Sequence, residues 1–347
     1  MSAHALGSPS AGAWPLPGTA YTMTAMTGTA LGPRHPSTLE PIPHGATTRR
    51  LDWLLLPPVV RRLVEDRFGT TVVEAVSAGS GFTPGLAAVL VGADGRRMFL
   101  KAASKVAQKP FAAAYADEIR KLRALPTGLP VTRLLWSHVD DLWVLLAFEH
   151  VEHHNPARPW VPHELEACLD TLEVLAQSLT PPPMTLDTFA HDFADCLGSW
   201  EHVRRVAPQW PHLDEAVALA GRFEEATRGR TLVHTDVRDD NFLIPDHGRP
   251  LLCDWNFPTV GAAWIDTVCL LIGASGDGLD VEEVLARRAL TRKVPARDID
   301  SLLALLAGYF LERRDAPVPN SSPFLRHHQS WYAEATWAWL ARRQGWA

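Results

Sequence analysis

The chain has 347 residues, of which 46% are hydrophobic and 21% charged, and a formal net charge of -6 at pH 7. A chain of this length can bury a large core and is expected to form two lobes or domains. The negative net charge leaves no basic surface for nucleic acid and no polybasic patch for a membrane, so we expect neither partner.

Three features favour a cytoplasmic protein. The N-terminus lacks the charged and then apolar pattern of a secretory signal. The longest apolar run, LLALLAGYFL at residues 302–311, is too short to span a bilayer. None of the four cysteines forms a CxxC pair, and all lie in apolar or helical contexts that are typical of reduced thiols.

The N-terminal half is predicted to be rich in strands. Residues 1–47 are rich in Pro, Gly, Ala, Ser and Thr without hydrophobic periodicity, so we expect a disordered tail. A short amphipathic helix is predicted over 58–69, where a glycine ends it. Three strands follow over 72–76, 86–91 and 97–102, with a Gly-rich loop between the first two.

The later segments change from strands to helices. Their predicted bounds are a helix over 112–126, strands within 131–139 and 141–151, helices over 161–179 and 213–229, and a helical region from 260 to 347. This order predicts a nucleotide-binding sheet lobe at 48–150. A helical lobe with the catalytic loop and the acceptor site is then predicted at 151–347.

The segment LVHTDVRDDNFLIPDHGRPLLCDWNF, residues 232–257, places acidic side chains beside apolar runs. A hairpin of strands 242–244 and 251–253 would bring Asp236 and Asn241 next to Asp254. Mg²⁺ prefers oxygen ligands and is usually held by one or two protein groups and phosphate. We therefore predict Asn241 and Asp254 as metal ligands and Asp236 as the residue that orients an acceptor hydroxyl and takes its proton. The alternative is a solvated acidic hairpin without function.

The spacing of HTDVRDDN matches the kinase catalytic loop H-R-D-x-x-x-x-N. Kinase chemistry also needs a glycine loop over the phosphates, a strand lysine and a helix glutamate. The chain offers these upstream, in order, as GSGFTPG with Gly79, Gly81 and Phe82, then Lys101, then Glu118. Each alone has an ordinary explanation as a turn, a surface lysine or a solvated acid, but their order and spacing favour phosphoryl transfer.

These motifs resemble the aminoglycoside phosphotransferase and choline kinase-like group of small-molecule kinases. The resemblance runs from about residue 49 to the C-terminus and is also carried by FLK, YADEIRKL, WVLLAFEHV, LLCDW and GAAWIDTVCLL. It implies an α+β fold class, namely a bilobal protein kinase-like fold. The N-lobe would have a small antiparallel sheet with one helix, and the C-lobe would be large and mainly helical. It further implies that the γ-phosphate of ATP, or of GTP, is transferred with Mg²⁺ to a hydroxyl of a small molecule.

The resemblance also implies residue roles. Asp236 would be catalytic, and Lys101 would contact the α and β phosphates while paired with Glu118. The backbone through Phe148, Glu149 and Val151 would bind adenine. Asp266 would brace the catalytic loop. His234 would hold the shape of that loop, with a plain core histidine as the equal alternative.

Several positions depart from the family pattern. Thr235 stands where glycine is frequent, and Asn256 where an acid is frequent. Arg238, Asp239 and Asp240 replace a frequent His-Pro-Gly. We expect Arg238 to stabilise charge on the transferred phosphate, and a salt bridge to one of the two neighbouring acids is the alternative.

Other interpretations concern the acceptor and the class of protein. Trp264, Asp277, Asp280 and Glu282 either line an acid-rich acceptor site or belong to a solvated loop. A catalytically weak pseudokinase acting through partners is the main alternative function, although no catalytic position is lost. A protein kinase is disfavoured because D-F-G and A-P-E are absent, and a metal-dependent hydrolase would leave Lys101 and Glu118 without a role. The acceptor and the oligomeric state remain open.

Overall fold

The computed structural model describes residues 32–33 and 47–346. The tail predicted for residues 1–47 therefore lies outside the described residues, except for residues 32, 33 and 47. Within the described part, no helix is both long and apolar enough to cross a membrane. All four cysteines are free thiols, as their contexts in the sequence indicate.

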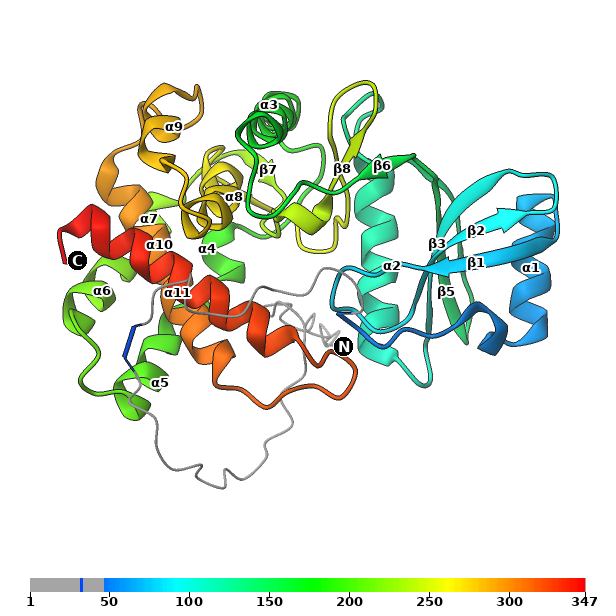
Figure 1. Ribbon diagram of the computed structural model, residues 1–347, viewed down its shortest axis with the longest axis horizontal. Coiled ribbons are helices and arrows are strands. Elements are labelled where there is room, and N and C mark those ends of the chain that lie inside the picture. Colours follow the sequence, from blue (N-terminus) through cyan, green and yellow to red (C-terminus); the bar gives the residue numbers. More distant parts are fainter. Residues whose placement is uncertain (1–31, 34–46, 347) are drawn as a thin grey trace, which may run out of the picture.

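A five-stranded antiparallel sheet forms one end of the molecule, with strand order β1-β2-β3-β5-β4 (Figure 1). All five strands match the predicted ones. Their bounds are β1 (Val72–Ser77), β2 (Leu86–Gly92), β3 (Arg97–Ser104), β4 (Leu134–Val139) and β5 (Trp143–Glu149).

Two helices cover the two faces of this sheet. The helix α1 (Pro58–Phe68) shares a core with Leu100 of β3, and α2 (Lys109–Ala124) shares another with Leu146 of β5. Side chains alternate along a strand, so Lys101 lies on the opposite face from Leu100, the face that α2 covers. The sheet therefore directs Lys101 toward α2. The helix α1 ends as predicted at Gly69, whose φ of 76° favours glycine.

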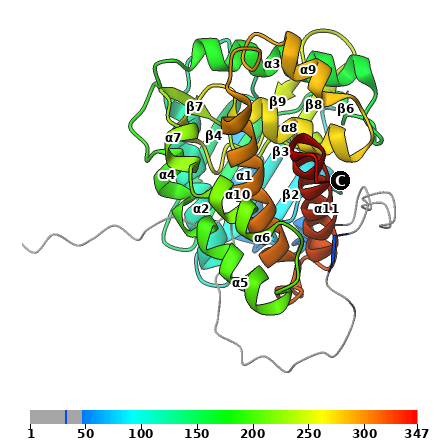
Figure 2. The same ribbon diagram turned by 90° about the vertical axis from the view of Figure 1, so that its left-hand side faces the viewer.

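The other end of the molecule is mainly helical. Its longest helices, α10 (Ala296–Arg314) and α11 (Leu325–Gln344), pack side by side (Figure 2). Around them lie α3 (Pro162–Ser178), α4 (Phe189–Asp192), α5 (Ser199–Val206), α6 (Leu213–Ala220), α7 (Phe223–Ala226), α8 (Ile265–Gly276) and α9 (Val281–Arg287). Short 3-10 turns of this part are η3 (Ala194–Gly198) and η4 (Asp239–Asn241), whereas η2 (Trp53–Leu55) packs with α1 against the sheet.

The prediction of one continuous helix over 213–229 is wrong. The helix α6 ends at Ala220, and α7 begins at Phe223. Gly221 follows α6 as its C-cap, and the amide of Arg222 makes a tight turn to the carbonyl of Leu219. Glycine is a weak helix former, and the break lets Phe223 enter the core.

Short strands between α7 and α8 position the predicted catalytic segment. The strand β7 (Thr231–Val233) pairs with β10 (Thr259–Gly261). The predicted hairpin is formed by β8 (Phe242–Pro245) and β9 (Leu251–Leu252), and β6 (His153–His154) pairs with β8. Because β7 and β8 are held in two different sheets, the segment between them must bridge the space between those sheets. Residues 234–241 form this bridge.

Candidate active site

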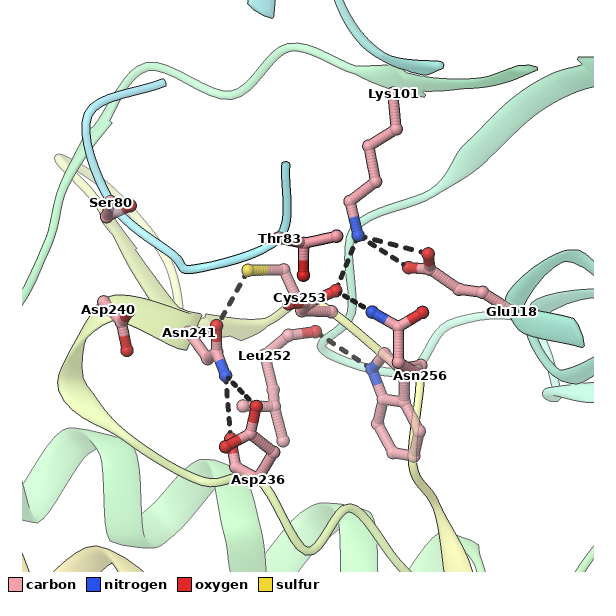
Figure 3. A network of polar contacts seen from close by, with 12 residues as sticks. Ser80, Thr83, Lys101, Glu118, Asp236, Asp240, Asn241, Leu252, Cys253 and Asn256 are labelled. Atoms are coloured by element: carbon pink, nitrogen blue, oxygen red, sulfur yellow. Dashed lines mark hydrogen bonds and ion pairs between the residues drawn. The ribbon is translucent and has the colours of Figure 1, made fainter. Parts of the chain in front are cut away.

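A largely buried lysine, Lys101, connects the sheet to the helical half of the site (Figure 3). The Nζ of Lys101 lies 2.9 Å from Oε1 of Glu118 and 2.6 Å from Oδ1 of Asp254. Glu118 is completely buried on α2. The predicted pair of Lys101 and Glu118 is thus assembled, and Lys101 also contacts one of the two predicted metal ligands.

The charges of this cluster stabilise one another. Burial by itself would lower the pKa of Lys101, but the carboxylates of Asp254 and Glu118 outweigh it and raise that pKa above its ordinary value. Burial would raise the pKa of Asp254, but the charge and the hydrogen bond of Lys101 lower it. Lys101 and Asp254 are therefore both charged at neutral pH.

The first turn of α8 fixes the loop between β7 and β8 by hydrogen bonds. The carboxylate of Asp266 accepts hydrogen bonds from the amides of His234, at 2.7 Å, and Thr235, at 2.9 Å. Thr235 has a φ of 66°, where glycine is usual, and its hydroxyl donates to the carbonyl of Phe257 at 2.8 Å. This hydrogen bond and the two to Asp266 accommodate a side chain at a position that favours glycine.

His234 is a buried, neutral residue of this loop. Its Nε2 lies 2.9 Å from the carbonyl oxygen of Cys253 and donates to it, and burial lowers the pKa of the imidazole. The ring therefore ties the loop to the segment that carries Asp254. This contact agrees with the expected role in holding the loop, although the ring is also as buried as a core histidine.

Asp236 stands between an arginine and an amide. Its carboxylate forms an ion pair with Arg238, and Nδ2 of Asn241 lies 2.8 Å from its carbonyl oxygen and 3.3 Å from Oδ2. Only 8% of Asp236 is exposed. Burial raises the pKa of Asp236 to about 6, even though the charge of Arg238 opposes the shift. A carboxylate with this pKa is suited to accept a proton near neutral pH.

Two oxygen atoms at the predicted metal site remain available. In the part of the chain that the structure describes, Oδ1 of Asn241 and Oδ2 of Asp254 accept no hydrogen bond. Asn256 donates to the other oxygen of Asp254, so the amide that replaces an acid here supports the ligand position. An amide oxygen and a carboxylate oxygen are the hard ligands that Mg²⁺ prefers, so the donor set fits this ion.

A pocket of 250 Å³ opens between the sheet and the hairpin. The predicted residues that line it are Gly79, Gly81, Phe82, Lys101, Phe148, Glu149, Val151, Asn241 and Asp254. Glu118, Asp236 and Arg238 are not among its walls; Glu118 reaches it through Lys101, and Asp236 through Asn241. The Gly-rich loop, Lys101, the end of β5 and the two predicted metal ligands, which were predicted separately, thus line one pocket.

Sequence reasoning missed several walls of this pocket. They are Arg50, Tyr115, Thr132, His153 and Asn155. Tyr115 lies three residues before Glu118, so its helical spacing from that residue was a usable signal. Arg50 precedes the first helix at the edge of the predicted tail and carries no motif.

The acids considered for the acceptor site lie elsewhere. Asp277 binds Arg158, with 2.6 Å between Oδ2 and Nε. Asp280 caps the N-terminus of α9, and Glu282 binds Arg343. Trp264 is buried, and none of these four residues lines the 250 Å³ pocket. Asp277 is a largely buried ion-pair partner, whereas Asp280 and Glu282 are exposed and line a separate pocket of 650 Å³ beside α11.

Comparisons with known proteins agree with this geometry. The family model described as "Phosphotransferase enzyme family" matches residues 80–305. No curated protein sequence matches the chain significantly.

Three solved structures share the fold at low sequence identity. An aminoglycoside phosphotransferase from Alicyclobacillus acidocaldarius is 17% identical, covers 79% of this chain and 92% of its own, and has a TM-score of 0.51. Choline kinase LicA from Streptococcus pneumoniae is 12% identical over 80% and 99%, with a TM-score of 0.51. The AMP-bound spectinomycin phosphotransferase APH(9)-Ia is 11% identical over 81% and 98%, with a TM-score of 0.54.

Proposed function

The chain belongs to the phosphotransferase enzyme family, and on that premise we propose that it transfers the γ-phosphate of ATP to a hydroxyl of a small molecule. The observation that carries the proposal is the assembly around one pocket of Lys101, Asn241 and Asp254, with Asp236 bonded to Asn241. Each of these residues has a separate role in phosphoryl transfer: Lys101 at the phosphates, Asn241 and Asp254 at the metal, and Asp236 at the acceptor hydroxyl.

The 250 Å³ pocket is assigned to the nucleotide. Its wall includes the end of β5 at Phe148 and Glu149 and the following Val151. The ring of His153 donates to the carbonyl of Val151 at 2.6 Å, whereas the amide of Val151 donates to no described residue. We assign this amide as a donor to the base, and GTP is the alternative to ATP because the contact is made by backbone. A spectinomycin phosphotransferase of the same fold is described as AMP-bound, which supports a nucleotide here.

Asn241 and Asp254 would hold Mg²⁺ through the oxygens that they leave free. The ion supplies positive charge that neutralises the phosphates. Lys101 adds its own charge to the same region, and the fixed pair with Glu118 keeps the ammonium in place. The residues of the chain therefore orient the phosphates before the reaction begins.

Asp236 is proposed to position the acceptor. Its carboxylate holds the acceptor hydroxyl, whose oxygen forms the new bond to the γ-phosphorus. The bond from that phosphorus to the bridging oxygen breaks, and the diphosphate leaves. The hydroxyl proton passes to Asp236, whose pKa of about 6 suits a base at neutral pH. Arg238, paired with Asp236, is placed to stabilise charge that develops on the transferred group.

We assign nucleotide binding to residues 48–150 and the acceptor site to 151–347. The acceptor is proposed as a hydroxylated small molecule. The acids Asp277 and Glu282 are paired with arginines, so they give no reason to require an amine on it. The pseudokinase alternative is disfavoured because the catalytic aspartate, asparagine and lysine are all present and in contact through their neighbours.

The test is release of ADP from Mg²⁺-ATP, with Mg²⁺-GTP in parallel, over a panel of hydroxylated amines, sugars and antibiotics. The wild type is compared with Asp236→Asn and with a sample containing EDTA. We expect release that requires one acceptor and is lost both in the variant and with EDTA. Turnover that survives Asp236→Asn would refute the role of Asp236. Nucleotide binding without turnover on this panel would leave the nucleotide site standing and would mean that the acceptor is of another class.

A further inference from the structure

An arginine outside the predicted motifs holds the Gly-rich loop between β1 and β2. The guanidinium of Arg50 donates to the carbonyl of Ala78 at 3.1 Å, to that of Thr83 at 2.8 Å, and to that of Ser80. A Cβ at Gly81 would lie 3.1 Å from Nη2 of Arg50. The loop therefore wraps closely around this one side chain, and the φ of 80° at Gly81 favours glycine there.

The remaining carbonyls of the loop are also engaged from outside. The hydroxyl of Thr47 donates to the carbonyl of Gly81 at 2.5 Å, and the amide of Thr47 donates to that of Gly79 at 3.2 Å. The hydroxyl of Ser322 donates to that of Phe82 at 2.7 Å. Every carbonyl oxygen from Ala78 to Thr83 thus accepts a hydrogen bond from outside the loop.

The amides of the same loop are left available. Among the described residues, the N–H groups of residues 79–83 have no hydrogen-bond acceptor. A loop with engaged carbonyls and free amides presents partial positive charge to its surroundings. Ser80 and Thr83 of this loop line the same pocket as Asn241 and Cys253, and Figure 3 shows the loop next to these two residues.

Arg50 places a full positive charge beside the Gly-rich loop, and this charge has no carboxylate partner among the described residues. Arg158 and Arg238, by contrast, each pair with two aspartates. Among the described residues no carboxylate lies within ion-pair distance of Arg50, and its bonds go only to peptide carbonyls, which solvate a cation but do not neutralise it. Burial lowers the pKa of its guanidinium accordingly. Arg50 lines the same pocket as Lys101 and Asp254.

We propose that Arg50 is a phosphate-binding residue of the nucleotide site, a second cation beside Lys101. A guanidinium has five N–H donors, and three hydrogen bonds to the loop leave two donors for phosphate oxygens. The nucleotide phosphates supply the anion that Arg50 lacks and also reach the free amides of residues 79–83. The inference rests on the proposed function, since it requires a nucleotide in this pocket.

The experiment compares the affinities of ADP and adenosine, measured by calorimetry with Mg²⁺ present. The variants are Arg50→Gln, which loses the charge but keeps amide donors for the loop, and Arg50→Lys, which keeps the charge. Arg49→Gln is the matched control, because Arg49 is the exposed neighbour. We expect Arg50→Gln to weaken ADP binding about 10- to 100-fold and adenosine binding less than about twofold. Arg50→Lys should recover most of the ADP affinity, and Arg49→Gln should match the wild type.

Different outcomes would contradict the role of Arg50 and the proposed function. Equal losses for ADP and adenosine in Arg50→Gln would mean that Arg50 only shapes the loop, which would overturn the inference. Unchanged ADP affinity would overturn it as well. If Arg50→Gln does not fold, the Lys variant decides, because a loss of adenosine affinity as large as that of ADP contradicts a phosphate contact. A wild type that binds neither ligand would contradict the proposed function itself.

Discussion

The guanidinium of Arg238 forms an ion pair with the carboxylate of Asp236, two residues earlier in the same loop. It also forms an ion pair with Asp240 at 2.9 Å, whereas the carboxylate of Asp239 forms an ion pair with Arg158 at 2.8 Å. The sequence left a phosphate contact and a salt bridge to Asp239 or Asp240 as alternatives. The structure has the bridge to Asp240, but the pair is buried and also includes the proposed base, so it is not an ordinary surface salt bridge.

Replacing Arg238 with alanine should lower kcat by about 100-fold, because a fixed positive charge next to the reacting groups is lost. The variant Arg249→Ala is the control, since Arg249 is exposed on the nearby hairpin. Steady-state kinetics with saturating acceptor measure the effect. A loss no larger than that of the control would remove Arg238 from the mechanism.

The pH profile should report the unusual pKa of Asp236. Burial raises that pKa to about 6, and the base must be ionised, so kcat/KM should fall as the pH drops below about 6. Arg238 opposes this shift, so Arg238→Ala should move the acidic limb to higher pH. A limb that stays in place or moves to lower pH in the variant would contradict the electrostatic role of Arg238.

Asp266→Ala should destabilise the protein, because the amides of His234 and Thr235 would lose their acceptor. Unsatisfied donors of this kind cost roughly 1–3 kcal/mol each, so a loss of about 2–6 kcal/mol in the free energy of unfolding is expected for the two. Urea denaturation measures it, with the exposed Asp246→Ala as control. Stability equal to that of the control would show that Asp266 does not brace the loop.

Lys101→Met should leave the fully buried Glu118 without its nearest cation. We expect a loss of roughly 3 kcal/mol in the free energy of unfolding at pH 8. Burial raises the pKa of Glu118, so in the folded variant this side chain becomes protonated and uncharged as the pH falls. The loss should therefore be small at acid pH and grow as the pH rises.

The double variant Lys101→Met/Glu118→Gln tests the cause of that loss. It removes both charges of the pair, so it should be more stable at pH 8 than Lys101→Met alone. The exposed Lys293→Met serves as control. Chemical denaturation at several pH values gives the comparison. A loss in Lys101→Met that does not depend on pH would contradict the charge argument.

The sequence by itself determined the elements whose signals are local. Short apolar runs, alternating or continuous, between turn signals predicted the five strands of the sheet, and Gly69 predicted the end of α1. The spacing of Asp236, Asn241 and Asp254 predicted that they would meet, since a short hairpin leaves little freedom to the chain between them. The apolar periodicity over 213–229 wrongly predicted one helix, because it continues through Gly221, where the chain turns between α6 and α7.

The tertiary structure alone decided the contacts between residues that no short pattern connects. Arg50 binds the Gly-rich loop from the segment before α1. Arg158 forms an ion pair with Asp277, which is more than a hundred residues away in the sequence. It also decided that Asp277 and Glu282 each pair with an arginine, Arg158 and Arg343. The physical reason is that periodicity and spacing report only the direction and nearest neighbours of a side chain. The partner of a buried charge depends on which elements the complete core brings together.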